Sequence, residues 1–96
     1  MQKVYEVTIN YNYNLDCPGE EDHVTKTKLF STKEKAQHYL LNGVKNDFSE
    51  WISESLERDP KNDDFEMNDE KTKLWTKLDW SAGMEFSAKI NERNVH

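Results

Sequence analysis

The sequence predicts an α+β fold of the order ββαββ, a four-stranded antiparallel sheet with one long helix packed on one face. Apolar and polar side chains alternate over 3–15 and again over 84–90, which is the period of a half-buried strand. Between these runs, apolar residues recur over 36–56 in steps of three and four and draw one stripe along a helix. Two layers bury all these faces most simply, so we expect residues 1–96 to form a single domain.

The first two strands are predicted to form a hairpin. Apolar and aromatic side chains occupy the odd positions of the first strand, namely Tyr5, Val7, Ile9, Tyr11, Tyr13 and Leu15. Pro18 and Gly19 then favour a reversal of the chain. A second strand is expected over 24–30, and its lysines Lys26 and Lys28 favour an edge position.

A helix is predicted to begin at Ser31, because Ser31-Thr32-Lys33-Glu34 has the form of a capping box. Pro60 places its end at Arg58 or Asp59. Gly43, which follows Asn42, leaves open a kink or a break into two helices.

Packing of the helix follows from the shared periodicities. We expect Leu40, Phe48 and Trp51 to lie on a sheet face formed by Tyr5, Val7, Ile9, Leu78 and Phe86.

The rest of the chain is predicted as a loop and a second hairpin. Residues 59–70 are rich in Asp, Asn and Lys and are interpreted as a loop. A third strand is expected over 72–80, a short connection at Ser81-Ala82-Gly83, and a fourth strand over 84–90. The tail from Glu92 to His96 is expected to fray.

Negative charge is concentrated between Asp47 and Glu70. This stretch holds ten carboxylates against two bases, a charge of −8 in a chain whose net charge is −6. Four of the acids are spaced to share one strip of the helix, and the loop continues them. The candidate partner-binding residues are therefore Asp47, Glu50, Glu54, Glu57, Asp59, Asp63, Asp64 and Glu66. The alternative is an ordinary solvated helix face.

Motifs for metal, cofactor or covalent chemistry are weak. Asp59 and Glu70 have the spacing of the ends of a calcium-binding loop, but Asp64 stands where that loop needs glycine. A weak, nonspecific cation site at Asp63, Asp64 and Glu66 remains an alternative. The three histidines lack metal-ligand spacing, and acids beside Cys17, the single cysteine, would raise its thiol pKa. We expect a non-enzymatic protein without cofactor or metal.

A second candidate surface lies on the predicted third strand. Lys71, Lys73, Trp75 and Lys77 alternate onto one of its faces, and Lys89 falls on the matching face of the next strand. Lysines around an aromatic ring can bind single-stranded nucleic acid. The alternative is a surface tryptophan covered by Phe65 or Met67.

The junction Phe30-Ser31-Thr32-Lys33-Glu34-Lys35-Ala36 resembles the strand-to-helix junction of many small proteins from phages and mobile elements of Gram-positive bacteria. Size, acidity and architecture together resemble the type II anti-CRISPR proteins. That resemblance implies an acidic inhibitor that binds a Cas9-type nuclease and blocks its guide RNA or DNA site.

The expected function is therefore that of an interaction protein that binds a basic nucleic-acid-binding surface of a larger protein. A small nucleic-acid-binding or regulatory module is the alternative. The N-terminus lacks the apolar segment of a signal peptide, and no apolar run approaches a membrane span, so the expected location is the cytoplasm of a bacterial host cell.

Overall fold

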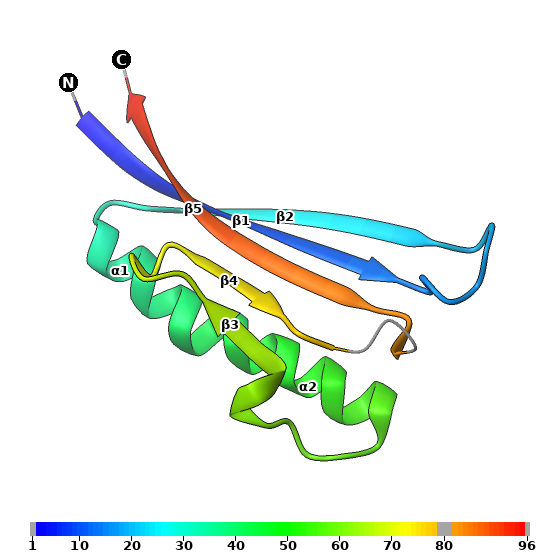
Figure 1. Cartoon of the computed structure of the whole chain (residues 1–96). Coiled ribbons are helices and arrows are strands. Elements are labelled where there is room, and N and C mark those ends of the chain that lie inside the picture. Colours follow the sequence, from blue (N-terminus) through cyan, green and yellow to red (C-terminus); the bar gives the residue numbers. More distant parts are fainter. Residues whose placement is uncertain (1, 79–81, 96) are drawn as a thin grey trace.

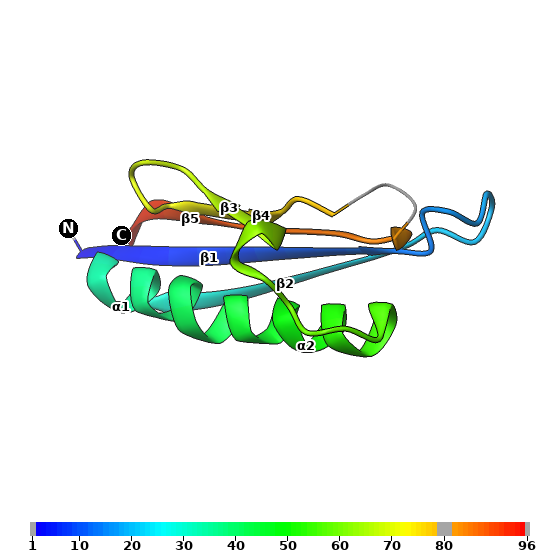
Figure 2. The same cartoon turned by 60° about the horizontal axis from the view of Figure 1, so that its bottom comes forward.

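A computed structural model describes residues 2–78 and 82–95, and it confirms the α+β class (Figure 1). Over these residues the chain forms one antiparallel sheet of five strands in the order β2-β1-β5-β4-β3. One long helical run lies across a single face of the sheet, as Figure 2 shows edge-on. The predicted two layers are therefore present, with one strand more than the four expected.

Strands β1 (Gln2–Tyr13), β2 (Asp22–Phe30) and β5 (Glu85–Val95) form the long part of the sheet. β1 pairs with β5 on one side and β2 on the other, and β2 is the predicted edge strand. The expectation that the tail frays is wrong, because β5 runs on through residues 92–95. These residues pair with the first residues of β1, from Gln2 opposite Val95, so the ladder continues where apolar alternation has stopped.

The predicted loop over 59–70 contains two short elements, the 3₁₀ turn η2 (Asn62–Asp64) and strand β3 (Phe65–Met67). β3 pairs with β4 (Lys73–Thr76) because Asn68 closes the turn between them: its Oδ1 accepts the backbone N–H groups of Thr72 and Lys73 at 2.8 and 2.9 Å. β4 is shorter than the predicted strand over 72–80. The end of that strand and the first residue of the predicted hairpin connection lie outside the described residues.

The helix runs without a break through α1 (Lys33–His38), the π-helical segment η1 (Tyr39–Val44) and α2 (Lys45–Leu56). Thr32 caps its N-terminus by accepting the Lys35 N–H, so the capping box predicted at Ser31 is misplaced by one residue. Gly43 lies in the π-helical segment, where an added Cβ would come within 2.7 Å of the Tyr39 ring.

The core lies between the helix and the strands at the centre of the sheet. Its largest fully buried side chains are Val7, Leu40, Val44, Phe48, Ile52, Leu74 and Phe86. The predicted packing of Leu40 and Phe48 on Val7, Ile9 and Phe86 is confirmed, whereas Tyr5 and Leu78 are only partly buried at its margin. Over residues 2–78 and 82–95, every helix is too short or too polar to traverse a bilayer.

Trp51 differs from its prediction as a core residue. Its side chain remains 37 % exposed, although its ring contacts those of Tyr13 and Phe86. Trp51 lies at one side of the apolar stripe of the helix, where its side chain still meets solvent.

Candidate functional site

Three of the four acids predicted on the helix, Glu50, Glu54 and Glu57, are exposed along α2 and at its C-terminal cap. Asp47 is half-buried, and its Oδ2 accepts a hydrogen bond from the Tyr11 hydroxyl. Burial, together with this bond, raises the pKa of Tyr11, which keeps the hydroxyl protonated as the donor. Asp47 therefore ties the helix to β1, while the other three face solvent.

The loop acids divide further. Asp64 is buried and forms a bidentate pair with Arg58, with N–O distances of 2.8 and 2.9 Å, and it also accepts the Lys61 N–H. The hydrogen bonds from Arg58 hold the Asp64 pKa below its usual range. Asp59 and Asp63 are exposed in this loop.

Glu66 belongs to another surface. It stands on β3 opposite Trp75 of β4, and its carboxylate lies 4.0 Å from the Lys77 Nζ. The neighbouring residues Phe65 and Met67 pack toward the helix, so Glu66 lies on the face of the sheet that the helix does not cover. The eight predicted residues consequently do not form one continuous ridge.

A second group of acids, which the sequence reasoning did not include, lies in and beside the β1–β2 turn. Asp16, Glu20, Glu21 and Asp22 are all exposed, at the end of the molecule toward which the C-terminus of α2 points (Figures 1 and 2). Together with the exposed helix acids they form a surface that we call the acidic end: Asp16, Glu20, Glu21, Asp22, Glu50, Glu54 and Glu57. None of the seven forms an ion pair with any residue in 2–78 or 82–95.

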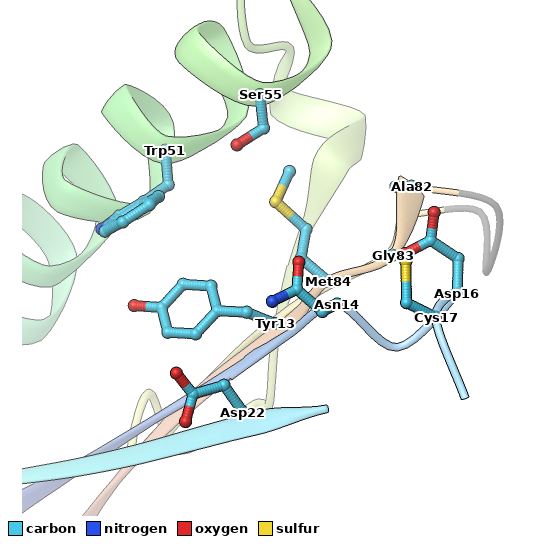
Figure 3. Close-up of a pocket in the computed structure, with 10 residues that line it drawn as sticks. All are labelled: Tyr13, Asn14, Asp16, Cys17, Asp22, Trp51, Ser55, Ala82, Gly83 and Met84. Atoms are coloured by element: carbon cyan, nitrogen blue, oxygen red, sulfur yellow. Dashed lines mark hydrogen bonds between the residues drawn. The ribbon is translucent and has the colours of Figure 1, made fainter. Parts of the chain in front are cut away.

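An open cavity of about 570 Å³ lies between α2, the ends of β1 and β2, and the residues before β5 (Figure 3). We call it the Trp51 pocket; its lining includes Tyr13, Asp16, Asp22, Trp51, Ser55 and Met84. The Tyr13 and Trp51 rings have centroids 5.0 Å apart and planes inclined by 48°. Burial raises the pKa of Tyr13, and the charges of Asp47 and Asp22 raise it further. The pocket thus combines aromatic rings with a negative field.

The alternative surface around Trp75 is less basic than its sequence suggests. Lys73 and Lys89 are direct cross-strand partners, and Trp75 is half-buried opposite Ser87. The expected cover by Phe65 or Met67 is wrong, because both side chains pack on the helix side of the sheet. Glu66 stands beside Trp75 instead and brings a carboxylate to this face.

Cys17 and the acidic side chains are the residues that bear on covalent and metal chemistry. The charge of Asp16 is the main cause of a raised pKa for the Cys17 thiol, which disfavours the reactive thiolate. Over residues 2–78 and 82–95, no three His, Cys, Asp or Glu side chains are grouped to hold a metal ion.

In comparisons with known proteins, no protein-family model, curated protein or solved structure matches the chain.

Proposed function

We propose that this protein is a non-enzymatic binding protein whose acidic end docks on a basic, nucleic-acid-binding surface of a larger protein. The carboxylates take the place of phosphates and prevent nucleic acid from binding there. A Cas9-type nuclease, blocked in guide RNA or DNA binding, is the partner class that the resemblance in size, charge and architecture suggests.

The observation that carries this proposal is that two exposed acidic segments from distant parts of the sequence lie toward the same end of the molecule. Residues 16–22 and 50–57 supply seven exposed carboxylates, which form no ion pair with the described residues. A field of one sign over a whole end of a small protein accelerates association with a surface of opposite charge.

The position of the helix acids adds to this argument. The last turn of α2 contains no basic residue, and Glu54 and Glu57 stand at the end where the helix dipole is negative. Each exposed carboxylate at such a place is unfavourable by about 0.3–1 kcal/mol at low ionic strength. Folding alone therefore disfavours this charge pattern, whereas a basic partner favours it.

The test compares two triple reversals that change the net charge equally, from −6 to zero. The first is Glu50→Lys, Glu54→Lys and Glu57→Lys at the acidic end. The matched control is Glu34→Lys, Asp69→Lys and Glu70→Lys, all exposed near the start of the helix, where the Gln37 side chain donates to the Glu70 carbonyl.

We expect the wild type and the control to retain a basic nucleic-acid-binding protein from a bacterial lysate, before and after nuclease treatment, and the acidic-end variant to lose it. With a purified Cas9-type nuclease, the first two should inhibit DNA binding and the third should not. Equal retention by all three proteins, or recovery of nucleic acid alone, would contradict the proposal.

A small nucleic-acid-binding module remains the second candidate, because Lys73, Lys89 and Trp75 share the uncovered face of the sheet. Its signature is direct binding of single-stranded nucleic acid that is lost in Lys73→Glu with Lys89→Glu and unchanged in the acidic-end variant.

A further inference from the structure

We propose that the Trp51 pocket receives the guanidinium group of an arginine side chain from the basic partner. This inference rests on the proposed function, because it names the side chain of the basic partner that binds at the acidic end. The pocket would be the point of specific recognition within a surface that otherwise attracts by charge alone.

The first support is the pair of rings that border the cavity. Tyr13 comes from the end of β1 and Trp51 from the middle of α2, and Figure 3 shows both at the cavity between these elements. Trp51 is 37 % exposed although the core lies beside it, with the Phe86 ring 6.3 Å away. Trp51 therefore stays partly accessible, and tryptophan is the preferred aromatic partner for a cation.

The second support is the presence of two carboxylates in the lining of the cavity, one beside Tyr13 and one at the side formed by Gly83. Asp22 is the direct cross-strand partner of Tyr13, so both side chains lie on the same face of the sheet. Asp16 also borders the cavity. Over residues 2–78 and 82–95, neither carboxylate has a basic side chain within ion-pair distance.

The third support is the chemistry that these walls select. An anion or a nucleic-acid phosphate is repelled by the two carboxylates. A bound metal ion needs several converging ligands, and the described residues offer no group of three His, Cys, Asp or Glu side chains. A guanidinium is planar, is less strongly hydrated than an ammonium, and can stack on an aromatic ring while it donates to a carboxylate. Arginine therefore fits the pocket better than lysine.

The experiment titrates the ¹⁵N-labelled protein with the blocked tripeptide acetyl-Gly-Arg-Gly-amide at constant ionic strength. Its control is the same peptide with citrulline, which has nearly the shape of arginine but no charge. We expect saturable shifts of the Trp51 indole N–H signal at tens of millimolar arginine peptide, and binding by the citrulline peptide at least fivefold weaker. Equal shifts with both peptides, or none at the Trp51 indole, would overturn the inference.

Two variants of the same turn test the role of charge. Asp22→Asn, on the exposed edge strand, should weaken arginine-peptide binding about three- to fivefold, the effect of an exposed charge pair. Glu20→Gln removes an equal charge from a residue that does not line the cavity, and should leave the affinity nearly unchanged. If the two variants bind the peptide equally, Asp22 has no specific role and the inference fails.

The peptide and the partner assays fail separately. Loss of the partner from the acidic-end variant, with no arginine-peptide binding by the wild type, overturns the pocket and leaves the proposed function standing. If the wild type binds the arginine peptide but the acidic-end variant still retains the partner, the pocket is supported and the proposed function is overturned.

Discussion

Asp64 and Glu54 come from the same acidic stretch, yet their surroundings give them different roles. Asp64 is 8 % exposed and accepts three hydrogen bonds, from Arg58 and the Lys61 N–H, whereas Glu54 is exposed on α2. A carboxylate held by charged donors stabilises the loop after the helix. An exposed carboxylate on a helix contributes little to folding.

The Asp64 pair gives the protein a pH-dependent contribution to stability. Since the folded-state pKa of Asp64 lies below its unfolded value, the folded state binds fewer protons, and this stabilisation is present near neutrality and lost as the pH falls. We expect Asp64→Asn to lower the unfolding free energy by about 1–3 kcal/mol at pH 7. Urea unfolding should show this difference shrinking below about pH 4, the usual range of aspartate. A difference independent of pH would show that the charge of Asp64 is not involved.

Gly83 joins the start of β5 to the β1–β2 turn. It has a φ of +71°, its carbonyl accepts the Leu15 N–H at 2.9 Å, and an added Cβ would lie 2.3 Å from the Asp16 carboxylate. Gly83→Ala should therefore destabilise the fold by about 1–2 kcal/mol through backbone strain, with a further loss from displacing Asp16. Thermal melting measures this; the control is Gly19→Ala, which has a similar φ but open space around it. Equal losses in both variants would mean that the contact with Asp16 adds nothing.

At the scale of the element, the helix has one face that is buried in the core and an adjacent side that borders the Trp51 pocket. Phe48 is fully buried against Tyr11 and Phe86, while Trp51, three residues later, borders the pocket. Both positions belong to one apolar stripe in the sequence. The difference arises because Phe48 packs on the rings of Tyr11 and Phe86 in the core, whereas Trp51 lines the open cavity beside Tyr13.

This division predicts different costs for two aromatic truncations. Phe48→Ala should cost about 3–5 kcal/mol, as for other buried aromatic residues. Trp51→Ala should cost less than about 2 kcal/mol, because much of its surface already meets water. Urea unfolding compares the two, with Phe48→Leu as a milder substitute if Phe48→Ala does not fold. Equal losses would place Trp51 in the core after all.

The sequence predicts the elements whose burial is periodic and misses those that depend on pairing. Alternation from Tyr5 to Tyr13 and the stripe from Ala36 to Leu56 specify β1 and the helix, because one face of each is buried. β3 has only Phe65 and Met67 to signal a strand, and the end of β5 is polar; both are strands because a neighbour supplies hydrogen bonds.

The candidate site is also predictable only where it depends on local spacing. Helical spacing predicts that Glu50, Glu54 and Glu57 lie together, and they do. The approach of Asp22 to Tyr13 and Trp51 depends on the β1–β2 register and the position of the helix on the sheet, which no local pattern encodes.

At the scale of the whole molecule, charge is distributed unevenly from end to end. The acidic end holds seven carboxylates without an ion pair among the described residues, whereas the opposite end mixes bases with acids: Lys3 pairs with Glu92 and Arg93 with Glu6. A molecule polarised in this way presents its negative end first to a basic surface.

Steering of this kind makes the association rate depend on salt. Raising the salt from about 50 to 500 mM should slow association with the basic partner by tenfold or more and change dissociation much less, since screening acts on the long-range field. The triple Glu→Lys variant at positions 50, 54 and 57 should show a shallower dependence. Surface plasmon resonance at several salt concentrations measures both rates, and an association rate indifferent to salt would argue against steering.

The pairing of Gln2 with Val95 places the two ends of the described chain side by side, at the end of the molecule remote from the β1–β2 turn (Figure 1). A short linker between them would therefore close the backbone into a ring with little disturbance of the sheet. New termini could then be opened at the tip of the Asn68–Lys71 turn, away from the acidic end. Such a circular permutant should keep the fold. In the unpermuted chain, a fluorophore or affinity handle attached beyond the end of β5 should leave the acidic end unobstructed.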